Sequence, residues 1–280
     1  MKRVLFILLL IPVNIAAQSH SKSDDFGFVL YLIGNGMKED AVTVMQNKHD
    51  NNDTTHYLKA IGLYYTHSLD SAAYHYCNVS DNSPLYDESR FFAALCNAHQ
   101  YRFDDAMQLL YTLHSNDIQT NNLKTFELAG VSLLKRDIVS FDSLIATLDT
   151  SDYRISEESL RLMQIKEQLC THSTKSPLLA ASLSAIIPGL GKVYAGNLGE
   201  GISSFLITGS LMAATAENWI KGGATNWKTV LFGSISALFY FGNIYGSAVT
   251  VNVARNQFNK DKDVQILYSI HIPLRNSYRH

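Results

Sequence analysis

The sequence predicts an all-α protein, in which a solenoid of helical repeats is followed by a small α-helical transmembrane domain of two to three short spans. Helical periodicity, with little of the alternation typical of strands, extends over residues 24–170. A shared pattern recurs in this region at intervals of 30, 35 and 37 residues. Residues 178–254 are instead apolar, rich in glycine and poor in charge, which is typical of helices packed in lipid.

The first 17 residues have the organisation of a secretory signal peptide. Lys2 and Arg3 form a short positive region, the apolar run "VLFILLLIPV" follows, and "NIAAQ" supplies the small residues of a cleavage site after Ala17. A membrane anchor that is not cleaved is the alternative, although the short apolar run favours cleavage. We therefore expect the region that follows to be exported.

Four segments of the repeat region share a short polar turn and an acidic residue near the start of a helix. The segments are "GMKEDAVTVM", "HSLDSAAYHY", "YRFDDAMQLL" and "IVSFDSLIATL", with Asp40, Asp70, Asp105 and Asp142. Their intervals suit a helix–turn–helix repeat of about 34 residues. A further helix, "SEESLRLMQIKEQLC", closes the region, and Ser156 is its expected N-cap.

The helix "LKAIGLYYTH" contains Ile61-Gly62-x-x-Tyr65, which is similar to the L-G-x2-Y element of tetratricopeptide repeats (TPRs). This resemblance implies helix pairs that approach closely at glycine and stack into a solenoid with a concave surface. The consensus Trp of these repeats is missing, so an irregular helical bundle is the alternative.

Composition and the aromatic residues of the repeats indicate the kind of partner. The net charge of −2 provides no basic field, so we expect no nucleic acid partner. Tyrosine-rich repeats favour recognition of peptides or glycans, and core packing is the competing interpretation for each ring. The tyrosines that we expect at a partner surface are Tyr64, Tyr65, Tyr74 and Tyr101.

The stretch "SAIIPGLGKVYAGNLGEG", residues 184–201, raises the question of a phosphate-binding loop. A Walker A loop needs Ser or Thr after its Gly-Lys pair, but Val193 follows Lys192. The dinucleotide-binding pattern also fails, because Tyr194 stands at the position of its third glycine. We therefore expect no nucleotide and no other cofactor, and we interpret the glycines as parts of a tight turn between helices.

Three charge-free runs, residues 176–191, 201–216 and 229–254, surround this turn. A membrane span needs about 20 apolar residues, so the third run is long enough and the first two fall slightly short. Trp219 and Trp227 bracket the second loop as expected interfacial residues. The expected turn and helix-packing residues are Pro188, Gly189, Gly191, Tyr194, Gly196, Gly201, Gly242, Asn243, Tyr245 and Gly246. For Asn243 we expect an interhelical hydrogen bond, and a polar path is the alternative.

Two ordered motifs, "PGLGKVYAGNLGEGISSFL" and "FYFGNIYG", carry a second resemblance. They are similar to motifs of small two-transmembrane-helix domains and of an uncharacterised membrane domain in bacterial envelope proteins of Bacteroidetes and delta-proteobacterial type. The resemblance implies a domain in the lipid bilayer of the bacterial inner membrane, with the preceding repeats in the periplasm. It implies no known chemistry, and glycine-mediated helix packing would allow a homo-oligomer.

No catalytic constellation stands out in the sequence, since G-x-S-x-G, HExxH and CxxC patterns are missing. His49 and His56 lie in an Asn/Asp-rich loop that could chelate a cation, but a solvated turn is favoured, so we predict no metal site. We expect a non-enzymatic, membrane-anchored periplasmic scaffold that binds a protein partner in cell-envelope assembly or secretion. The alternative is a small transporter or channel-like oligomer that the repeats regulate.

The expected domain organisation follows from these segments. A signal peptide at 1–17 precedes the repeat domain at 24–170, a linker at 171–177, the transmembrane domain at 178–254 and a polar tail at 255–280. Within the tail, "VQILYSIHIPL" alternates as a short strand would.

Overall fold

The computed structural model describes residues 22–46 and 50–278, so the predicted signal peptide and His49 lie outside the described residues. The described residues form thirteen helices and no strand, which confirms the all-α prediction. They divide into two compact units between Leu113 and His114. The boundary that the sequence indicated, residues 171–177, lies inside the second unit.

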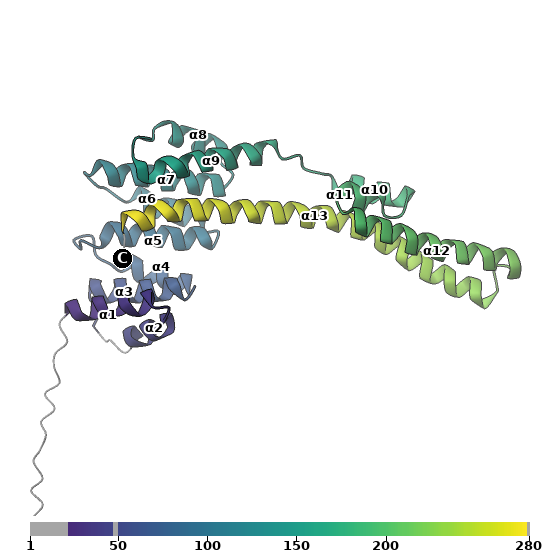
Figure 1. Cartoon of the computed structure of the whole chain (residues 1–280), viewed down its shortest axis with the longest axis horizontal. Helices are drawn as coiled ribbons and strands as arrows, with labels where there is room; N and C mark the ends of the chain where they lie inside the picture. Colours follow the sequence, from purple (N-terminus) through teal and green to yellow (C-terminus); the bar gives the residue numbers. More distant parts are fainter. Residues whose placement is uncertain (1–21, 47–49, 279–280) are drawn as a thin grey trace, which may run out of the picture. The chain divides into compact units, whose positions relative to one another are not determined.

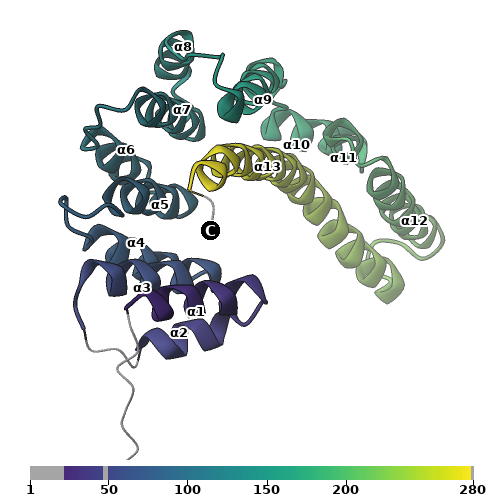
Figure 2. The same cartoon turned by 60° about the vertical axis from the view of Figure 1, so that its left-hand side comes forward.

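The first unit consists of three antiparallel helix pairs. Its helices stack in chain order, each beside the next, as Figure 2 shows. Aromatic rings fill the core, where Tyr76 stacks on Phe92 with a centroid distance of 5.7 Å and Tyr57 meets Tyr76 edge-on. The helices are α1 (Lys22–Gly34), α2 (Lys38–Gln46), α3 (Asp53–Tyr65), α4 (Leu69–Cys77), α5 (Tyr86–His99) and α6 (Phe103–Tyr111).

One turn geometry recurs in every helix pair, including α7 (Ile118–Leu134) and α8 (Ile138–Ala146) of the second unit. One residue of each connection has a positive φ, and the N–H of the next residue donates to the carbonyl five positions earlier at 2.9 Å. This is the hydrogen bonding of a Schellman motif, which ends a helix abruptly. The positive-φ residues are Gly36, His67, Tyr101 and Arg136, at intervals of 31, 34 and 35 residues. The repeat-like character of the chain is therefore confirmed.

Two local predictions about the helices have different outcomes. At Gly62, a Cβ atom would lie 3.1 Å from Val42 Cγ2, so this glycine permits the close approach of α2 and α3 that the TPR-like motif implies. The prediction of Ser156 as an N-cap is wrong. The N-cap of helix α9 (Tyr153–Thr171) is Asp152, four residues earlier, whose carboxylate accepts a hydrogen bond from the Arg154 N–H.

Helix α13 (Trp227–Ser277) organises the second unit. Its first half packs against α10 (Pro177–Ile186), α11 (Leu190–Ala195) and α12 (Leu198–Gly222), and α12 runs antiparallel beside it (Figure 1). Its second half packs against α7 and α9. Ile270 fits against Gly130 of α7, where a Cβ atom would clash, and Arg136 pairs with Asp263 at 2.7 Å.

The prediction of a short strand in the tail is wrong, because residues 264–274 belong to α13. Buried Ile266, Ile270 and Leu274 follow one another at intervals of four residues, which places them on one face of a helix. The helical spacing of these apolar residues outweighs the local alternation, because a helix places all three side chains on the face that packs against α7 and α9.

The structure does not support the predicted transmembrane domain or the inner-membrane localisation. Among the described helices, none combines the length and the apolar character that a membrane crossing requires. The charge-free runs were misleading, because lack of charge differs from apolarity. Ser, Thr and Gly residues lower the mean hydropathy of α12, which also contains Glu217 and Lys221 near its C-terminus. Asn243 interrupts the apolar part of α13.

Candidate functional site

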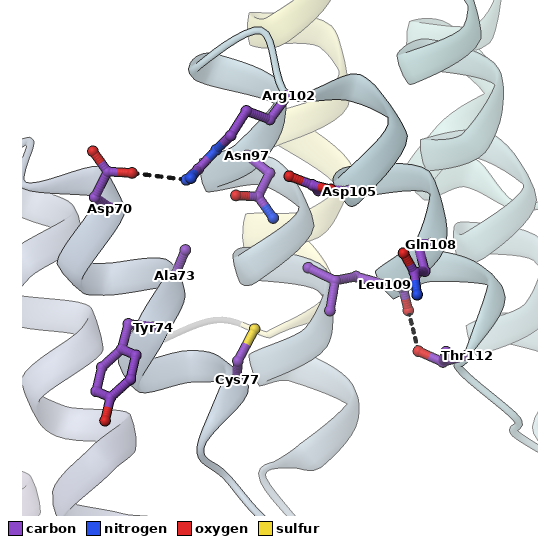
Figure 3. Close-up of a pocket in the computed structure, with 10 residues that line it drawn as sticks. All are labelled: Asp70, Ala73, Tyr74, Cys77, Asn97, Arg102, Asp105, Gln108, Leu109 and Thr112. Atoms are coloured by element: carbon purple, nitrogen blue, oxygen red, sulfur yellow. Dashed lines mark hydrogen bonds and ion pairs between the residues drawn. The ribbon is translucent and has the colours of Figure 1, made fainter.

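The candidate site is a pocket of about 450 Å³ in the first unit, between α4, α5 and α6. It spans two successive helix pairs, since α4 belongs to the second pair and α5 and α6 form the third. We call it the repeat pocket. Figure 3 shows its ten lining residues, Asp70, Ala73, Tyr74, Cys77, Asn97, Arg102, Asp105, Gln108, Leu109 and Thr112.

The recurring turn places the charges at one end of the repeat pocket. Tyr101 takes the positive φ, and the backbone N–H of Arg102 returns to the carbonyl of Asn97. This geometry directs the guanidinium toward the preceding helix pair, where it pairs with Asp70 at 2.9 Å (Figure 3). Both side chains of the pair are largely exposed, so the ion pair adds little stability and is available for exchange with a ligand.

Asp105 adds a second carboxylate to the pocket. It lies in the first turn of α6, where the positive end of the helix dipole stabilises a negative charge. Among the described residues Asp105 makes no ion pair, so the pocket carries one carboxylate more than its single guanidinium can neutralise. The pocket is therefore mildly acidic.

The floor of the repeat pocket is small and mostly apolar. Ala73 and Asn97 are buried, and Leu109 and Cys77 point into the space between α4 and α6 (Figure 3). Burial raises the pKa of the Cys77 thiol, which outweighs the opposite effect of Arg90. The thiol is therefore protonated at neutral pH and is a poor nucleophile.

Of the four predicted partner tyrosines, Tyr74 lines the repeat pocket and is 64% exposed. Tyr64 packs edge-on against Phe92, with a centroid distance of 5.6 Å. Tyr65 and Tyr101 are exposed elsewhere on the unit and do not line the pocket.

Sequence reasoning missed the charged residues of the pocket. Asp70 and Asp105 were predicted only to open helices, and they occupy adjacent rather than equivalent positions in successive repeats, three residues after His67 and four residues after Tyr101. Asp104 is the equivalent of Asp70, so the repeat period does not identify Asp105 as a neighbour of Asp70. No pattern marked Arg102.

A pair of histidines forms a second polar cluster in the first unit. His56 of α3 and His75 of α4 approach to 3.0 Å between their Nδ1 atoms, with the rings 5.3 Å apart. Burial lowers the pKa of both imidazoles, and Lys59 lowers them further. Asp53 opposes this effect on His56. The described residues contain no group of three or more side chains that could hold a metal ion.

The glycine-rich turn joins α10, α11 and α12. Gly189 and Gly196 have φ values of 88° and 110°, which only glycine adopts without strain. Gly191 lies against the carbonyl of Ala180, and Gly201 lies against Val193, so neither position has room for a side chain. Pro188 precedes α11, and the Tyr194 hydroxyl accepts a hydrogen bond from the Ser176 N–H at 3.2 Å.

The predicted packing residues of α13 lie in an unexpected arrangement. A Cβ atom at Gly242 would meet nothing within 4 Å, and Gly246 faces Lys192 Cε at 3.8 Å. The buried amide of Asn243 has no hydrogen-bond partner among the described residues, so the expected interhelical bond is not formed there. Ser184 and Ser247 make that contact instead, at 2.7 Å between their hydroxyl oxygens. Three further predicted residues, Tyr245, Trp219 and Trp227, are exposed.

Comparison with known proteins gives a partial similarity. A tetratricopeptide repeat protein 30 homolog of Caenorhabditis briggsae is 25% identical over 142 residues. The match covers 49% of this chain but 21% of that protein, so the chain spans a small part of its relative. No protein-family model matches the chain. No solved structure is significantly similar to it. The similarity and the recurring helix pairs together describe the chain as TPR-like in its repeats.

Proposed function

We infer that this protein is a non-enzymatic scaffold whose repeats bind a segment of a partner protein in the repeat pocket. The observation that carries the proposal is the position of this pocket across two successive helix pairs. Stacked helical repeats commonly present extended binding surfaces. The similarity to a tetratricopeptide repeat protein supports the same role.

The chemistry of the repeat pocket favours a partner segment with a basic side chain beside an apolar one. Asp105 offers a carboxylate without an ion pair among the described residues, and Asp70 can exchange Arg102 for a ligand cation. The apolar floor at Ala73 and Leu109 accepts a side chain of moderate size. Exposed Tyr74 extends the contact surface at one side. A rigid aromatic ring of this kind is typical of residues that dominate binding.

Two observations support a role without catalysis. The nucleophile in the repeat pocket, Cys77, has a raised thiol pKa because of its burial. The histidine pair of α3 and α4 does not line the pocket. The pocket therefore offers recognition groups and no activated nucleophile or base.

A selection experiment tests the proposal. A library of random twelve-residue peptides is selected against the protein, and the binders are compared in sequence and affinity. We expect peptides with Lys or Arg next to an apolar residue. Asp105→Lys should weaken their binding about tenfold or more, which corresponds to about 1.4 kcal/mol.

Asp104→Lys is the matched control, since this exposed neighbour has the same charge and lies outside the lining of the repeat pocket. Peptides that bind both variants equally would show that the pocket is not the binding site. Tyr74→Ala should also weaken binding while the circular dichroism of the helices stays unchanged. Circular dichroism and urea unfolding of each variant exclude loss of the fold as the cause.

A further inference from the structure

A second cavity, of about 350 Å³, lies in the second unit between α11, α12 and α13. We call it the hairpin pocket. Its volume is at the small end of the range for ligand sites, which is about 300–1,000 Å³. Part of its lining is apolar and part is polar, so it suits a ligand that has an apolar part and a polar group.

The polar end contains an amide that the protein itself leaves unsatisfied. Asn243 is 6% exposed, and neither its Nδ2 nor its Oδ1 has a hydrogen-bond partner among the described residues. A buried polar group without a hydrogen-bond partner lowers the stability of the folded state. Asn243 lines the hairpin pocket, where a ligand can supply an acceptor for Nδ2.

Lys192 supplies a cation to the lining of the same pocket. Lys192 is half-buried and donates from Nζ to the Ser204 hydroxyl at 3.0 Å, and both residues line the hairpin pocket. Among the described residues Lys192 makes no ion pair, so its charge is not neutralised by the protein. A half-buried ammonium in the same pocket as an unsatisfied amide attracts an anion that accepts hydrogen bonds.

The opposite wall is apolar and accessible. Ile207 of α12 and Leu238 and Phe239 of α13 line it, and Leu238 is 74% exposed. Gly242 keeps the centre open, since a Cβ atom there would meet nothing within 4 Å. An aliphatic chain can therefore lie along this wall while its head group reaches Lys192 and Asn243.

We propose that the hairpin pocket binds a medium-chain aliphatic carboxylate. The carboxylate accepts hydrogen bonds from Lys192 Nζ and Asn243 Nδ2, and the alkyl chain covers Ile207, Leu238 and Phe239. The site is independent of the repeat pocket and takes a small molecule, not a polypeptide segment.

Equilibrium dialysis of the full chain with decanoate tests the proposal, at concentrations below those at which decanoate self-associates. Decanol and decylamine are the neutral and cationic comparison ligands. We expect saturable binding of decanoate, with decanol weaker and decylamine weakest. Equal binding of all three ligands would overturn the proposal, because it would show adsorption to the exposed apolar surface.

Three variants assign the site. Lys192→Met keeps the aliphatic stem near Gly246 and should weaken decanoate binding about tenfold without changing that of decanol. Gly242→Leu should abolish binding of both ligands, because it fills the cavity. Asn243→Leu should weaken decanoate binding and leave the fold intact, since it replaces an unsatisfied amide by an apolar side chain.

Gly209→Leu is the control variant. A Cβ atom at this helical glycine of α12 also meets nothing within 4 Å, and the residue does not line the hairpin pocket. It adds the same apolar side chain to the same helix pair, so decanoate binding should equal that of the wild type. Loss of binding in Gly209→Leu and not in Gly242→Leu would place the ligand elsewhere and overturn the proposal.

Discussion

The helix pairs of the repeats and the antiparallel pair α12–α13 use apolar residues in opposite ways. In the repeats, large rings lie in the interior: Phe91 is fully buried, and Tyr57 and Tyr76 are nearly so. In α12–α13, rings of the same size lie outside, and Phe241 is 68% exposed. The two regions are equally helical, so the difference lies in how the helices are held together.

Small and polar residues hold the second kind of helix pair. The compact apolar cluster of this region consists of Ala180, Ala195 and Val251. Two hydrogen bonds of hydroxyl groups join the helices further. The hydroxyl oxygens of Ser184 and Ser247 lie 2.7 Å apart, and the Tyr240 hydroxyl donates to the carbonyl of Ala185 at 2.6 Å. Large apolar residues of this helix pair are thereby left exposed. The comparison teaches that helix content alone does not indicate where the core lies.

The largest expected difference concerns a single ring in each region. Phe91→Ala should lower the free energy of unfolding of the first unit by about 3–5 kcal/mol, because it creates a cavity in the core. Phe241→Ala should change that of the second unit by about 0.5 kcal/mol or less, because the ring is exposed. Urea midpoints of both variants measure the difference. Equal losses would show that the ring of Phe241 is covered in the folded protein.

A smaller effect is expected at the glycines of the second unit. Gly191→Ala places a methyl group against the carbonyl of Ala180, so it should cost about 1–3 kcal/mol. Gly209→Ala has open space around it and should gain up to about 1 kcal/mol from helix propensity. Hydrogen exchange of the α10 and α11 amides measures the first effect. Unchanged protection in Gly191→Ala would contradict the close approach of the two helices.

Glu127 is an exception among the buried residues of the helix pairs. In the described part of the chain, one oxygen of its carboxyl group has no hydrogen-bond partner, and burial raises the pKa of Glu127 well above the ordinary value of 4.5. The folded state therefore retains a proton that the unfolded state releases, so this group makes the protein less stable as the pH rises above about 4.5. Glu127→Leu should gain about 1–3 kcal/mol at pH 7.5.

Urea unfolding of Glu127→Leu and Glu127→Gln between pH 4.5 and pH 8 checks this expectation. Both variants should lose the part of the pH dependence that comes from Glu127, and the gain should be larger for leucine, which brings no polar atoms. A wild-type profile that rises in this range as much as those of the variants do would contradict the assignment.

The smallest effect is expected for the histidine pair of α3 and α4. The pKa values of His56 and His75 are lowered mainly by burial, so the unfolded state takes up protons more readily. Stability of the first unit should fall as the pH decreases through the ordinary value of 6.5. Because both rings are partly exposed, we expect less than about 1 kcal/mol. The urea midpoint of His75→Gln between pH 7.5 and pH 5.5 should vary less than that of the wild type, and an equal variation would exclude the pair as its source.

The sequence allowed the helix pairs to be predicted because their signals are local. Acidic residues in the first turns of α2, α4 and α6 act within one helical turn, and the close approach at Gly62 involves Val42 of the preceding helix. The turn residues His67, Tyr101 and Arg136 gave no signal, since side chains other than glycine rarely adopt a positive φ. Their conformation follows from the packing of the helices on each side.

The pockets and the course of α13 could not be predicted, because they depend on contacts between distant residues. Arg102 reaches Asp70 only through the geometry of the turn before α6. The tail has the local alternation of a strand, and its helical face is identified only by its packing against α7 and α9. The predicted membrane spans failed for a different reason, since counting charges overlooked the polar residues that remain in an uncharged run.

The long reach of α13 has a consequence for how the chain folds during its synthesis. Helices α1–α6 contact their neighbours in sequence, so they can assemble as soon as they leave the ribosome. Helix α7 packs against α13 only after α13 has been synthesised, because Gly130 and its contact Ile270 are 140 residues apart. At a synthesis rate of about 5–20 residues per second, this delay is roughly 7–28 s. During that time the apolar face of α7 is open to chaperones, and this interval is when the nascent chain is most exposed to aggregation.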